Sequence, residues 1–473
     1  MHVLDYNYEG AQIELRQRLQ ESLDSKGWKQ KDLVQATRID SVTISQLMNN
    51  KRRMTLPQLE TITKALKIQM NTFYEYFLGE CFNETGKLSP AKTAEFFIGC
   101  IKAERYDITK KIMDFINEDT DRKRLVDNTF KMAEHIFSSE QRNYSLPLYD
   151  IVITNSTTRS EQLAIAYFRR FIIARDVDLT VSGYETLHQL QEYLPLLPEE
   201  YKFDAYYKIL TFYNVVEKWD KLLNYAKELK ELATAENQKK YITEALLYEV
   251  AGYEGLKDYK TAIHVIKEYA TYGNEYAELA QINETLLFIE MGYVEYIDEH
   301  IKLISCDLNK LCVFLPVAIE TYLQKELLQN IEELLRTFEK EIMEICSKTH
   351  ILIKRHKLKL FQALSSYYFI KGEKDKGFKY NLEALQLALM FKNVERLRNI
   401  ILFHYQYDPS EEHKEEFVTI MTRGNNQYEE NMDFITGGSV LIRFYRNSSE
   451  TPLSVATSTE QSLAKTFIYG EGW

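Results

Sequence analysis

The chain has 473 residues, of which 45% are hydrophobic and 27% charged, and this length predicts two or more globular units rather than one core. The net charge of −11 argues against a protein that coats nucleic acid along its whole length. Only 17 Gly and 8 Pro interrupt long amphipathic segments rich in Leu, Lys, Glu and Tyr. These features predict a mainly α-helical protein.

The cysteines and the lack of long apolar runs indicate the cellular compartment in which we expect the protein. The five cysteines are odd in number and widely spaced, so we expect reduced, buried thiols and neither a disulfide framework nor a zinc site. The first ten residues lack an apolar signal core, and no run of about 18 apolar residues occurs. We therefore expect a cytoplasmic protein with no membrane contact.

The elements expected first are an arm over residues 1–10 and an amphipathic helix over residues 12–25, which Gly27 ends. Two short helices, Lys29–Thr37 and Ser41–Asn49, follow and are joined by a tight turn. The residues spaced to lock these two helices together are Leu33, Ala36, Ile39, Ile44 and Leu47. The pattern predicts a helix-turn-helix, and an ordinary surface hairpin is the alternative.

The second helix of this pair has a polar outward face and a basic exit. In a helix-turn-helix, that face enters the major groove, and its N-terminal residues meet the base edges. The residues expected to read bases are Ser41, Val42, Thr43 and Gln46. Those expected to hold phosphates are Lys29, Gln30, Asn49, Lys51, Arg52 and Arg53.

Two more helices are predicted beyond the pair. Thr55 caps one, with Pro57 in its first turn, and the other covers residues 71–78. Five short helices within residues 11–78 predict one small DNA-binding domain, which carries a net charge of +4. Residues 79–90 are expected to be a linker.

Residues 91–423 predict helix after helix with a recurring pattern of aromatic residues, short gaps and small residues near helix starts. An aromatic residue at the same place in this pattern recurs at Trp219, Tyr259 and Tyr296, at spacings of 40 and 37 residues. Gly377 belongs to a further copy of the pattern. A period of about 34 to 40 residues is typical of a TPR-like, right-handed α-solenoid. An irregular helical bundle is the alternative.

The concave face of such a solenoid is built mostly from the first helix of each repeat. The repeat register places seven residues there: Tyr207, Thr211, Asn214, Gln281, Glu284, Gln362 and Ser366. Asn and Gln amides each offer a donor and an acceptor to a peptide bond. We therefore expect an extended peptide to bind this face.

Residues 424–473 differ from the rest, with five of the 17 Gly and a strand-like alternation over residues 440–445. We expect a C-terminal extension of unknown role, either a short β element or a mobile tail. Phosphate-loop, dinucleotide-binding, zinc-protease and serine-hydrolase motifs do not occur, so no enzyme, metal or cofactor is expected. The basic segment Lys354–Lys357 is interpreted as a solvated helix face.

Residues 11–78 resemble the Cro/repressor (XRE-type) helix-turn-helix domain. The residues that carry the resemblance are Gly27, Gln30, Leu33, Ile44, Ser45, Leu47, Asn49 and Arg52. The resemblance implies phosphate contacts from Gln30 and the basic exit, and base contacts from Ser41, Val42 and Gln46. Arg38 stands where the family usually has Gly in the turn, and β-branched Val34 stands where a small residue is usual. Turn geometry and helix crossing are therefore expected to differ slightly.

An XRE domain before a helical-repeat body is similar to the peptide-pheromone-sensing regulators of Gram-positive bacteria and their phages, the RRNPP family. The phage arbitrium receptors are one branch of that family. The resemblance implies quorum sensing by a homodimer that binds a two-part operator, with a short imported peptide in the solenoid as effector.

These observations predict a cytoplasmic, homodimeric transcription regulator that binds a double-stranded DNA operator with two half-sites. A short signalling peptide would control it, and the late helices over residues 385–403 would form the dimer. The alternative is a TPR-type adaptor for protein–protein interaction, in which the helix-turn-helix is vestigial or only a tether.

Overall fold

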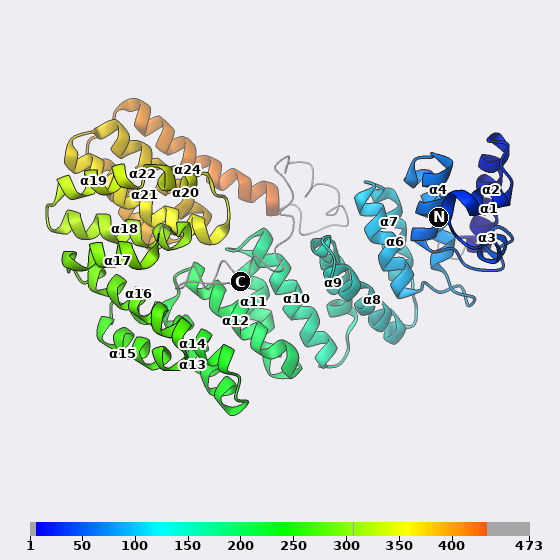
Figure 1. Ribbon diagram of the computed structural model, residues 1–473, viewed down its shortest axis with the longest axis horizontal. Helices are drawn as coiled ribbons and strands as arrows, with labels where there is room; N and C mark the ends of the chain where they lie inside the picture. Colours follow the sequence, from blue (N-terminus) through cyan, green and yellow to red (C-terminus); the bar gives the residue numbers. More distant parts are fainter. Residues whose placement is uncertain (1–5, 306, 433–473) are drawn as a thin grey trace. The chain divides into compact units, whose positions relative to one another are not determined.

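The computed structural model describes residues 6–305 and 307–432, and their fold is all-α (Figure 1). Within this part of the chain, strand pairing is limited to an isolated antiparallel bridge between Phe82 and Leu88. The chain forms two compact units. Unit 1 comprises residues 1–177 and 185–197, and unit 2 comprises residues 178–184 and 198–473.

Unit 1 begins with a group of short helices. They are α1 (Tyr8–Ser25), α2 (Gln30–Thr37), α3 (Ser41–Met48), α4 (Leu56–Leu66), the 3-10 turn η2 (Met70–Phe73), α5 (Tyr74–Phe77) and η3 (Leu78–Cys81). Local capping interactions fix where several of these helices begin. The Asp40 carboxylate accepts the backbone N–H of Thr43 at 2.8 Å, and Thr55 with Gln58 forms a capping box at the start of α4, with Pro57 in its first turn. Leu15, Leu33 and Ile44 are fully buried in the core of this group.

The first part of the predicted linker packs against these helices. Residues 79–82 are buried, and the Gln12 side-chain amide donates to the Gly79 carbonyl at 2.7 Å. Tyr74 and Phe77 place their rings against Phe96 of the next helix, at 5.3 and 4.9 Å between centroids. The helix-turn-helix group and the following helix therefore share a core.

The remaining helices of unit 1 follow in antiparallel succession. They are α6 (Pro90–Lys102), α7 (Tyr106–Asn117), α8 (Arg122–Phe137), η4 (Arg142–Ser145), α9 (Leu146–Asn155), α10 (Glu161–Val177), most of α11 (Ser182–Tyr193) and η5 (Leu194–Leu196). Gly99 of α6 lies against α4, where an added Cβ would come within 2.8 Å of Leu56. A small residue is needed there because the two helices approach closely.

Unit 2 is a longer helical-repeat array. Its helices are α12 (Glu199–Val215), α13 (Trp219–Ala235), α14 (Lys239–Gly255), α15 (Tyr259–Tyr269), η6 (Ala270–Tyr272), α16 (Asn274–Glu290), η7 (Val294–Tyr296), α17 (Ile297–Ile304), α18 (Leu308–Gln324), α19 (Leu328–Thr337), α20 (Glu339–Ser347), α21 (Ile351–Lys371), α22 (Lys374–Met390), α23 (Val394–Gln406) and α24 (Glu411–Met432). The recurring aromatic residues fall at equivalent places, since Trp219 begins α13 and Tyr259 begins α15. Among the first helices of successive pairs, α12 packs on α14, α16 on α18, and α18 on α21.

The turns inside the helix pairs share one feature of backbone conformation. A single residue with positive φ stands between the paired helices, such as Glu217 (56°), Lys257 (61°) and Glu326 (58°). Glycine fills this place only at Gly292 and Gly372 among the pairs of unit 2. The repeat is therefore regular in backbone conformation although its turn residues vary.

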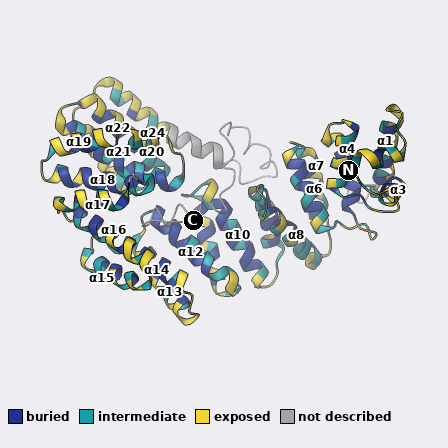
Figure 2. Cartoon of the chain, in the orientation of Figure 1, coloured by how far each residue is buried: buried dark blue, intermediate teal, exposed yellow. Residues whose placement is uncertain are grey.

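Burial follows the helix pairing, with buried residues on facing sides and exposed ones outward (Figure 2). One expectation was wrong. Arg355 and His356 of the basic segment in α21 are buried, with 7% and 5% of their surface exposed, because this side of the helix faces other elements of unit 2. Of the C-terminal extension, residues 424–432 continue α24, and the predicted strand over 440–445 lies outside the described residues.

Candidate functional site

Two short helices, α2 and α3, form the candidate DNA interface. The N terminus of α2 is ordered by a capping box, in which the Asp32 carboxylate accepts the Lys29 backbone N–H at 2.7 Å. Leu33 of α2 and Ile44 and Leu47 of α3 are fully buried, so the pair is held by its predicted apolar residues. The observed helix bounds lie within one residue of those expected from the sequence.

One residue in the turn between α2 and α3 has a left-handed backbone conformation, although it is not a glycine. Arg38 has φ 60° and ψ 16°, and its backbone N–H donates to the Val34 carbonyl at 2.9 Å. An arginine can occupy this conformation at a cost that glycine would avoid. Arg38 thus supplies the backbone conformation that its position requires.

The four residues predicted to read bases lie on the outer side of α3. Ser41, Val42 and Gln46 are exposed, and Thr43 is half-buried. Val42 has 64% of its surface exposed, which is unusual for an aliphatic residue. Such a side chain suits contact with a thymine methyl group in the major groove.

The residues predicted to hold phosphates lie at the end of α3 and at the N terminus of α2. Lys51 and Arg52 are exposed beyond α3, and the Arg52 guanidinium reaches the Thr43 hydroxyl at 3.5 Å. Asn49 caps α3 by donating its amide to the Ser45 carbonyl at 2.8 Å, and Arg53 donates to the Gly79 carbonyl at 3.4 Å. Lys29 and Gln30 stand at the N terminus of α2, where the Asp32 carboxylate already accepts the Lys29 backbone N–H.

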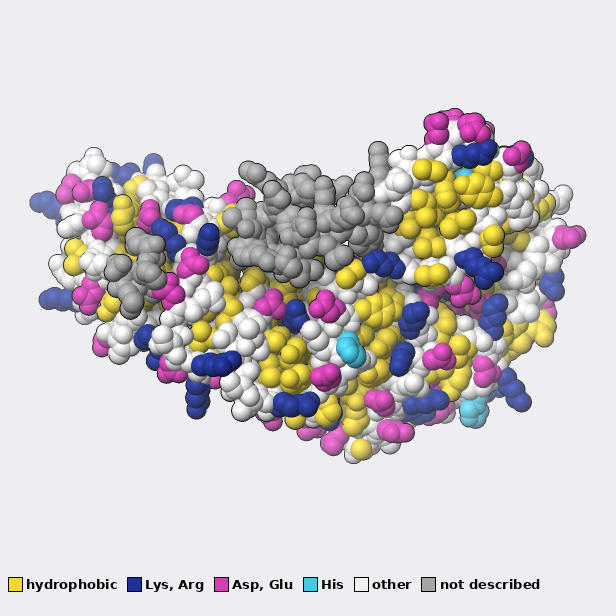
Figure 3. Space-filling view, turned by 180° about the vertical axis from the view of Figure 1, so that it is seen from behind, with side chains coloured by type: hydrophobic (Ala, Val, Ile, Leu, Met, Phe, Trp, Pro, Cys, Tyr) yellow, Lys and Arg dark blue, Asp and Glu magenta, His cyan; other side chains and the backbone are white. Residues whose placement is uncertain are grey.

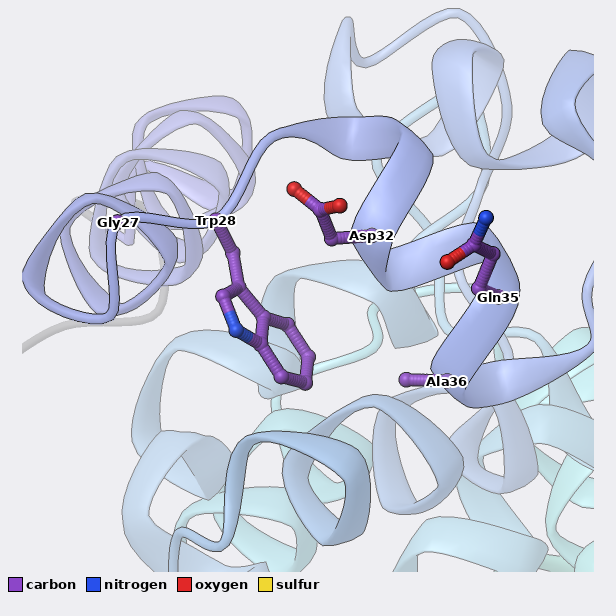
Figure 4. Close-up of a pocket in the computed structure, with 5 residues that line it drawn as sticks. All are labelled: Gly27, Trp28, Asp32, Gln35 and Ala36. Carbon is purple, nitrogen blue, oxygen red and sulfur yellow. The ribbon is translucent and has the colours of Figure 1, made fainter.

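A shallow open depression lies beside α2 (Figure 4). Its lining residues are Gly27, Trp28, Asp32, Gln35 and Ala36. Figure 4 shows the Trp28 indole and the Ala36 methyl group on opposite sides of it, with the Asp32 carboxylate above them in this view. This carboxylate would repel a phosphate, so the depression adds no phosphate contact to the candidate interface.

The residues predicted for the peptide-binding face lie on three helices of unit 2. On α12, the Thr211 hydroxyl is 3.0 Å from the Tyr248 hydroxyl, and the Tyr207 ring meets the Tyr248 ring edge-on. On α16, Gln281 is exposed and Glu284 is half-buried. On α21, the Ser366 hydroxyl donates to the carbonyl of its own helix at residue 362.

Two of the predicted residues, Asn214 and Gln362, belong to a polar network that joins distant parts of unit 2. Asn214 accepts from Arg355 at 3.2 Å, and Gln362 accepts from Arg396 at 2.6 Å. Both arginines meet Glu217, which lies in the turn after α12. Arg396 contacts it through two hydrogen bonds of 2.8 and 2.9 Å, and Arg355 lies 3.7 Å away.

The charge of Glu217 is stabilised in this network. Desolvation opposes ionisation, but Arg396 and Arg355 outweigh it and lower the pKa of Glu217 to about 2. The Asn393 amide also donates to this carboxylate at 2.8 Å. We call the set Asn214, Glu217, Arg355, Gln362, Asn393 and Arg396 the arginine network.

The sequence alone did not single out Glu217, Arg355 or Arg396. Glu217 and Arg396 are 179 residues apart, so no local spacing links them. Gln281 and Glu284 are outside the arginine network in the part of the chain that the structure describes. The predicted residues Asn214 of α12 and Gln362 of α21 are both members of the arginine network.

Other kinds of site find little support within the described ranges. No group of three or more His, Cys, Asp or Glu side chains is arranged there to hold a metal ion. The helices described include none that is both long and apolar enough to cross a membrane. The described cysteines, Cys81, Cys100, Cys312 and Cys346, are free thiols.

The helix-turn-helix geometry defines the class of the N-terminal part as a DNA-binding domain. Residues 18–77 match the family described as the Cro/C1-type HTH DNA-binding domain. The chain therefore carries a DNA-binding domain of this type, as the XRE resemblance implied. No curated protein is significantly similar to the chain in sequence.

Proposed function

We propose that the chain is a homodimeric transcription regulator whose binding to a two-part DNA operator is controlled by a short peptide held in unit 2. The Cro/C1-type domain supports the DNA-binding part of this proposal. The arginine network is the observation that carries the peptide part.

The network supports a peptide site because of where its members come from. Asn214 lies at the end of α12 and Glu217 in the turn after it, whereas Arg355 and Gln362 lie on α21 and Arg396 on α23. Long side chains thus link helices that are far apart along the array. A ligand that competes for these side chains would alter the link, and with it the curvature of unit 2.

The side chains of the arginine network are of the types that bind the C-terminal carboxylate of a peptide. Two guanidinium groups converge on one carboxylate, an arrangement that also recognises the terminal carboxylate of a peptide. The side-chain amides of Asn214 and Gln362 can pair with peptide bonds once released from the arginines. About 23% of the Arg396 side chain is exposed, so solvent and ligands can reach the network.

An apolar area supports the dimer. Val394, Leu402 and Tyr405 occupy one face of α23 and have 76%, 60% and 51% of their surface exposed, and Val418 of α24 has 54%. Figure 3 shows hydrophobic side chains gathered over the C-terminal part of unit 2. Leu385, at the start of the predicted dimer segment, is fully buried, so the proposed contact lies on α23 and α24.

A peptide selection tests the proposal. A random library of peptides of about six residues with free carboxyl ends is selected on the full chain, and the best binder is measured against Arg396→Gln. Arg336→Gln is the matched control, because Arg336 is exposed on α19, outside both the arginine network and the proposed dimer contact. We expect Arg396→Gln to weaken binding by about tenfold or more, since a bidentate charged contact is lost, and Arg336→Gln to bind like the parent.

Selection of no peptide by the full chain would contradict the proposal. It would favour the adaptor hypothesis if unit 2 instead bound a folded protein. Equal peptide affinity in Arg396→Gln and Arg336→Gln would remove the arginine network from the site.

A further inference from the structure

A buried ion pair joins the two ends of the DNA-binding domain. Arg16 of α1 and Glu80 of η3 form a salt bridge, and their side chains are 6% and 0% exposed. Both residues lie just outside the segment 18–77 that matches the Cro/C1-type domain. The pair therefore links the two segments that flank the matched domain.

Arg16 holds the end of the recognition helix α3. Its guanidinium donates to the Leu47 carbonyl at 3.1 Å and to the Arg52 carbonyl at 3.3 Å. The last carbonyls of a helix lack partners within the helix, so a buried cation there satisfies them and complements the helix dipole. Arg16 thus fixes the end of α3 and the basic loop that follows it.

Glu80 holds the same loop from its other side. One carboxylate oxygen accepts from Arg16, and the other accepts the Met54 backbone N–H at 2.6 Å. A buried ion pair repays its desolvation only when its remaining hydrogen-bonding capacity is used, as it is here. The loop over residues 49–54 is consequently held between Arg16 and Glu80.

Glu80 also stands where the chain leaves the DNA-binding domain for α6. The next residue, Cys81, is buried, and its carbonyl accepts the Ser89 backbone N–H at 2.8 Å just before α6 begins. Any displacement of this connection would move Glu80 relative to Arg16.

We infer that Glu80 is a positioning residue for DNA recognition: acting through Arg16, it sets the position of the end of α3 and of its basic loop, and it couples them to the segment that enters α6. Neither Arg16 nor Glu80 need touch DNA for this role. Loss of the pair should lower the discrimination between DNA sequences more than the general attraction to DNA, because the phosphate-binding cations remain in place.

The test compares Glu80→Gln with Glu84→Gln in the full chain. An amide keeps the shape of Glu80, and its single acceptor oxygen is attracted more strongly by the Arg16 cation than by a neutral N–H. The N–H₂ group then faces the Met54 N–H, and that contact is lost. Glu84 is exposed in the same segment and loses the same charge, which makes it the matched control. The probes are the tightest duplex that the parent selects from a random library and an unselected duplex of equal length.

We expect Glu80→Gln to bind the selected duplex about tenfold more weakly, to bind the unselected duplex within about twofold of the parent, and to keep the salt dependence of binding. Glu84→Gln should match the parent on both duplexes. Hydrogen exchange at the Met54 amide should accelerate in Glu80→Gln, because that N–H loses its acceptor. Glu80→Asp retains the charge and should recover part of the discrimination.

An unchanged ratio of the two affinities in Glu80→Gln would overturn the inference, whether both affinities stay the same or fall together. A fall of both together would indicate a role in stability alone. If Glu80→Gln does not fold, the same ratio is measured for Glu80→Asp and Arg16→Lys, and a parental ratio in both would equally overturn the inference.

Discussion

Gln46 and Arg52 belong to the same helix and loop but are expected to act differently on DNA. Gln46 is exposed on the face of α3 that meets bases, and Arg52 is exposed beyond it. We expect Gln46→Ala to relax base preference at one position at a cost of about 1–3 kcal/mol, with an unchanged salt dependence. Arg52→Ala should weaken binding to all sequences and reduce the slope of log affinity against log salt by about one. Titrations at several salt concentrations distinguish the two, and parental behaviour in both variants would contradict the interface.

The buried side chain of His300 is expected to make the stability of unit 2 depend on pH. Burial lowers the pKa of His300 to about 4, while its Nδ1 lies 2.8 Å from the Thr285 hydroxyl. Because the folded-state pKa is below the unfolded value of about 6.5, the unfolded state binds the proton first as the pH falls. Stability contributed by neutral His300 is therefore complete above pH ~6.5 and is lost progressively toward pH ~4.

We expect His300→Gln to reduce the loss of stability between pH 7.5 and pH 5 by about 2 kcal/mol. Denaturant unfolding at both pH values measures the free energy of unfolding of the variant and of the parent. His264, which is exposed on α15, supplies the control variant His264→Gln, and this variant should show the parental pH dependence. If His300→Gln shows the parental pH dependence of stability, His300 is not the cause of that dependence.

At the scale of elements, close helix contacts in unit 2 depend on small residues. An added Cβ at Gly255 would lie 2.3 Å from the Trp219 indole, and one at Gly252 would lie 2.6 Å from the end of Leu223. The indole is rigid and has the Arg355 guanidinium 5.5 Å from its ring centre, whereas a leucine can rotate.

We therefore expect Gly255→Ala to destabilise unit 2 by about 1–3 kcal/mol and Gly252→Ala to cost less. Thermal unfolding of the two variants gives the ranking. The reverse order would mean that the indole moves more easily than the leucine.

Local elements could be predicted from the sequence because their causes are local. Helix α3 follows its capping residue Asp40, and Ile44 and Leu47 mark its buried side, so its start was predicted correctly. The polarity of residues 354–357 was a poor guide to exposure, because charge does not reveal that α21 lies inside unit 2. Pairs such as Glu217 with Arg396, or Arg16 with Glu80, depend on helices brought together by the fold.

At the scale of the whole molecule, affinity for a two-part operator depends on two copies of the domain being held together. Half-sites in this class of motif lie about 34 Å apart or a multiple of that distance, so the spacing of the recognition helices decides affinity. A domain of net charge +4 on a chain of −11 should bind weakly alone.

We expect Leu402→Glu with Tyr405→Glu to yield a monomer, because two charges would be buried in the proposed contact. Sedimentation velocity measures the change. Leu256→Glu is the control, since Leu256 has 46% of its surface exposed elsewhere in unit 2. A parental mass in the α23 double variant would place the dimer contact elsewhere or contradict the dimer.

The central claim is that a peptide in unit 2 controls the DNA-binding domain. The most direct measurement is the affinity of the full chain for its selected duplex, without peptide and at saturation with the selected peptide. If the peptide controls DNA binding, this affinity changes by about tenfold or more on peptide saturation, in line with ordinary coupling between two sites. An affinity that stays within about twofold while the peptide saturates its site would contradict peptide control.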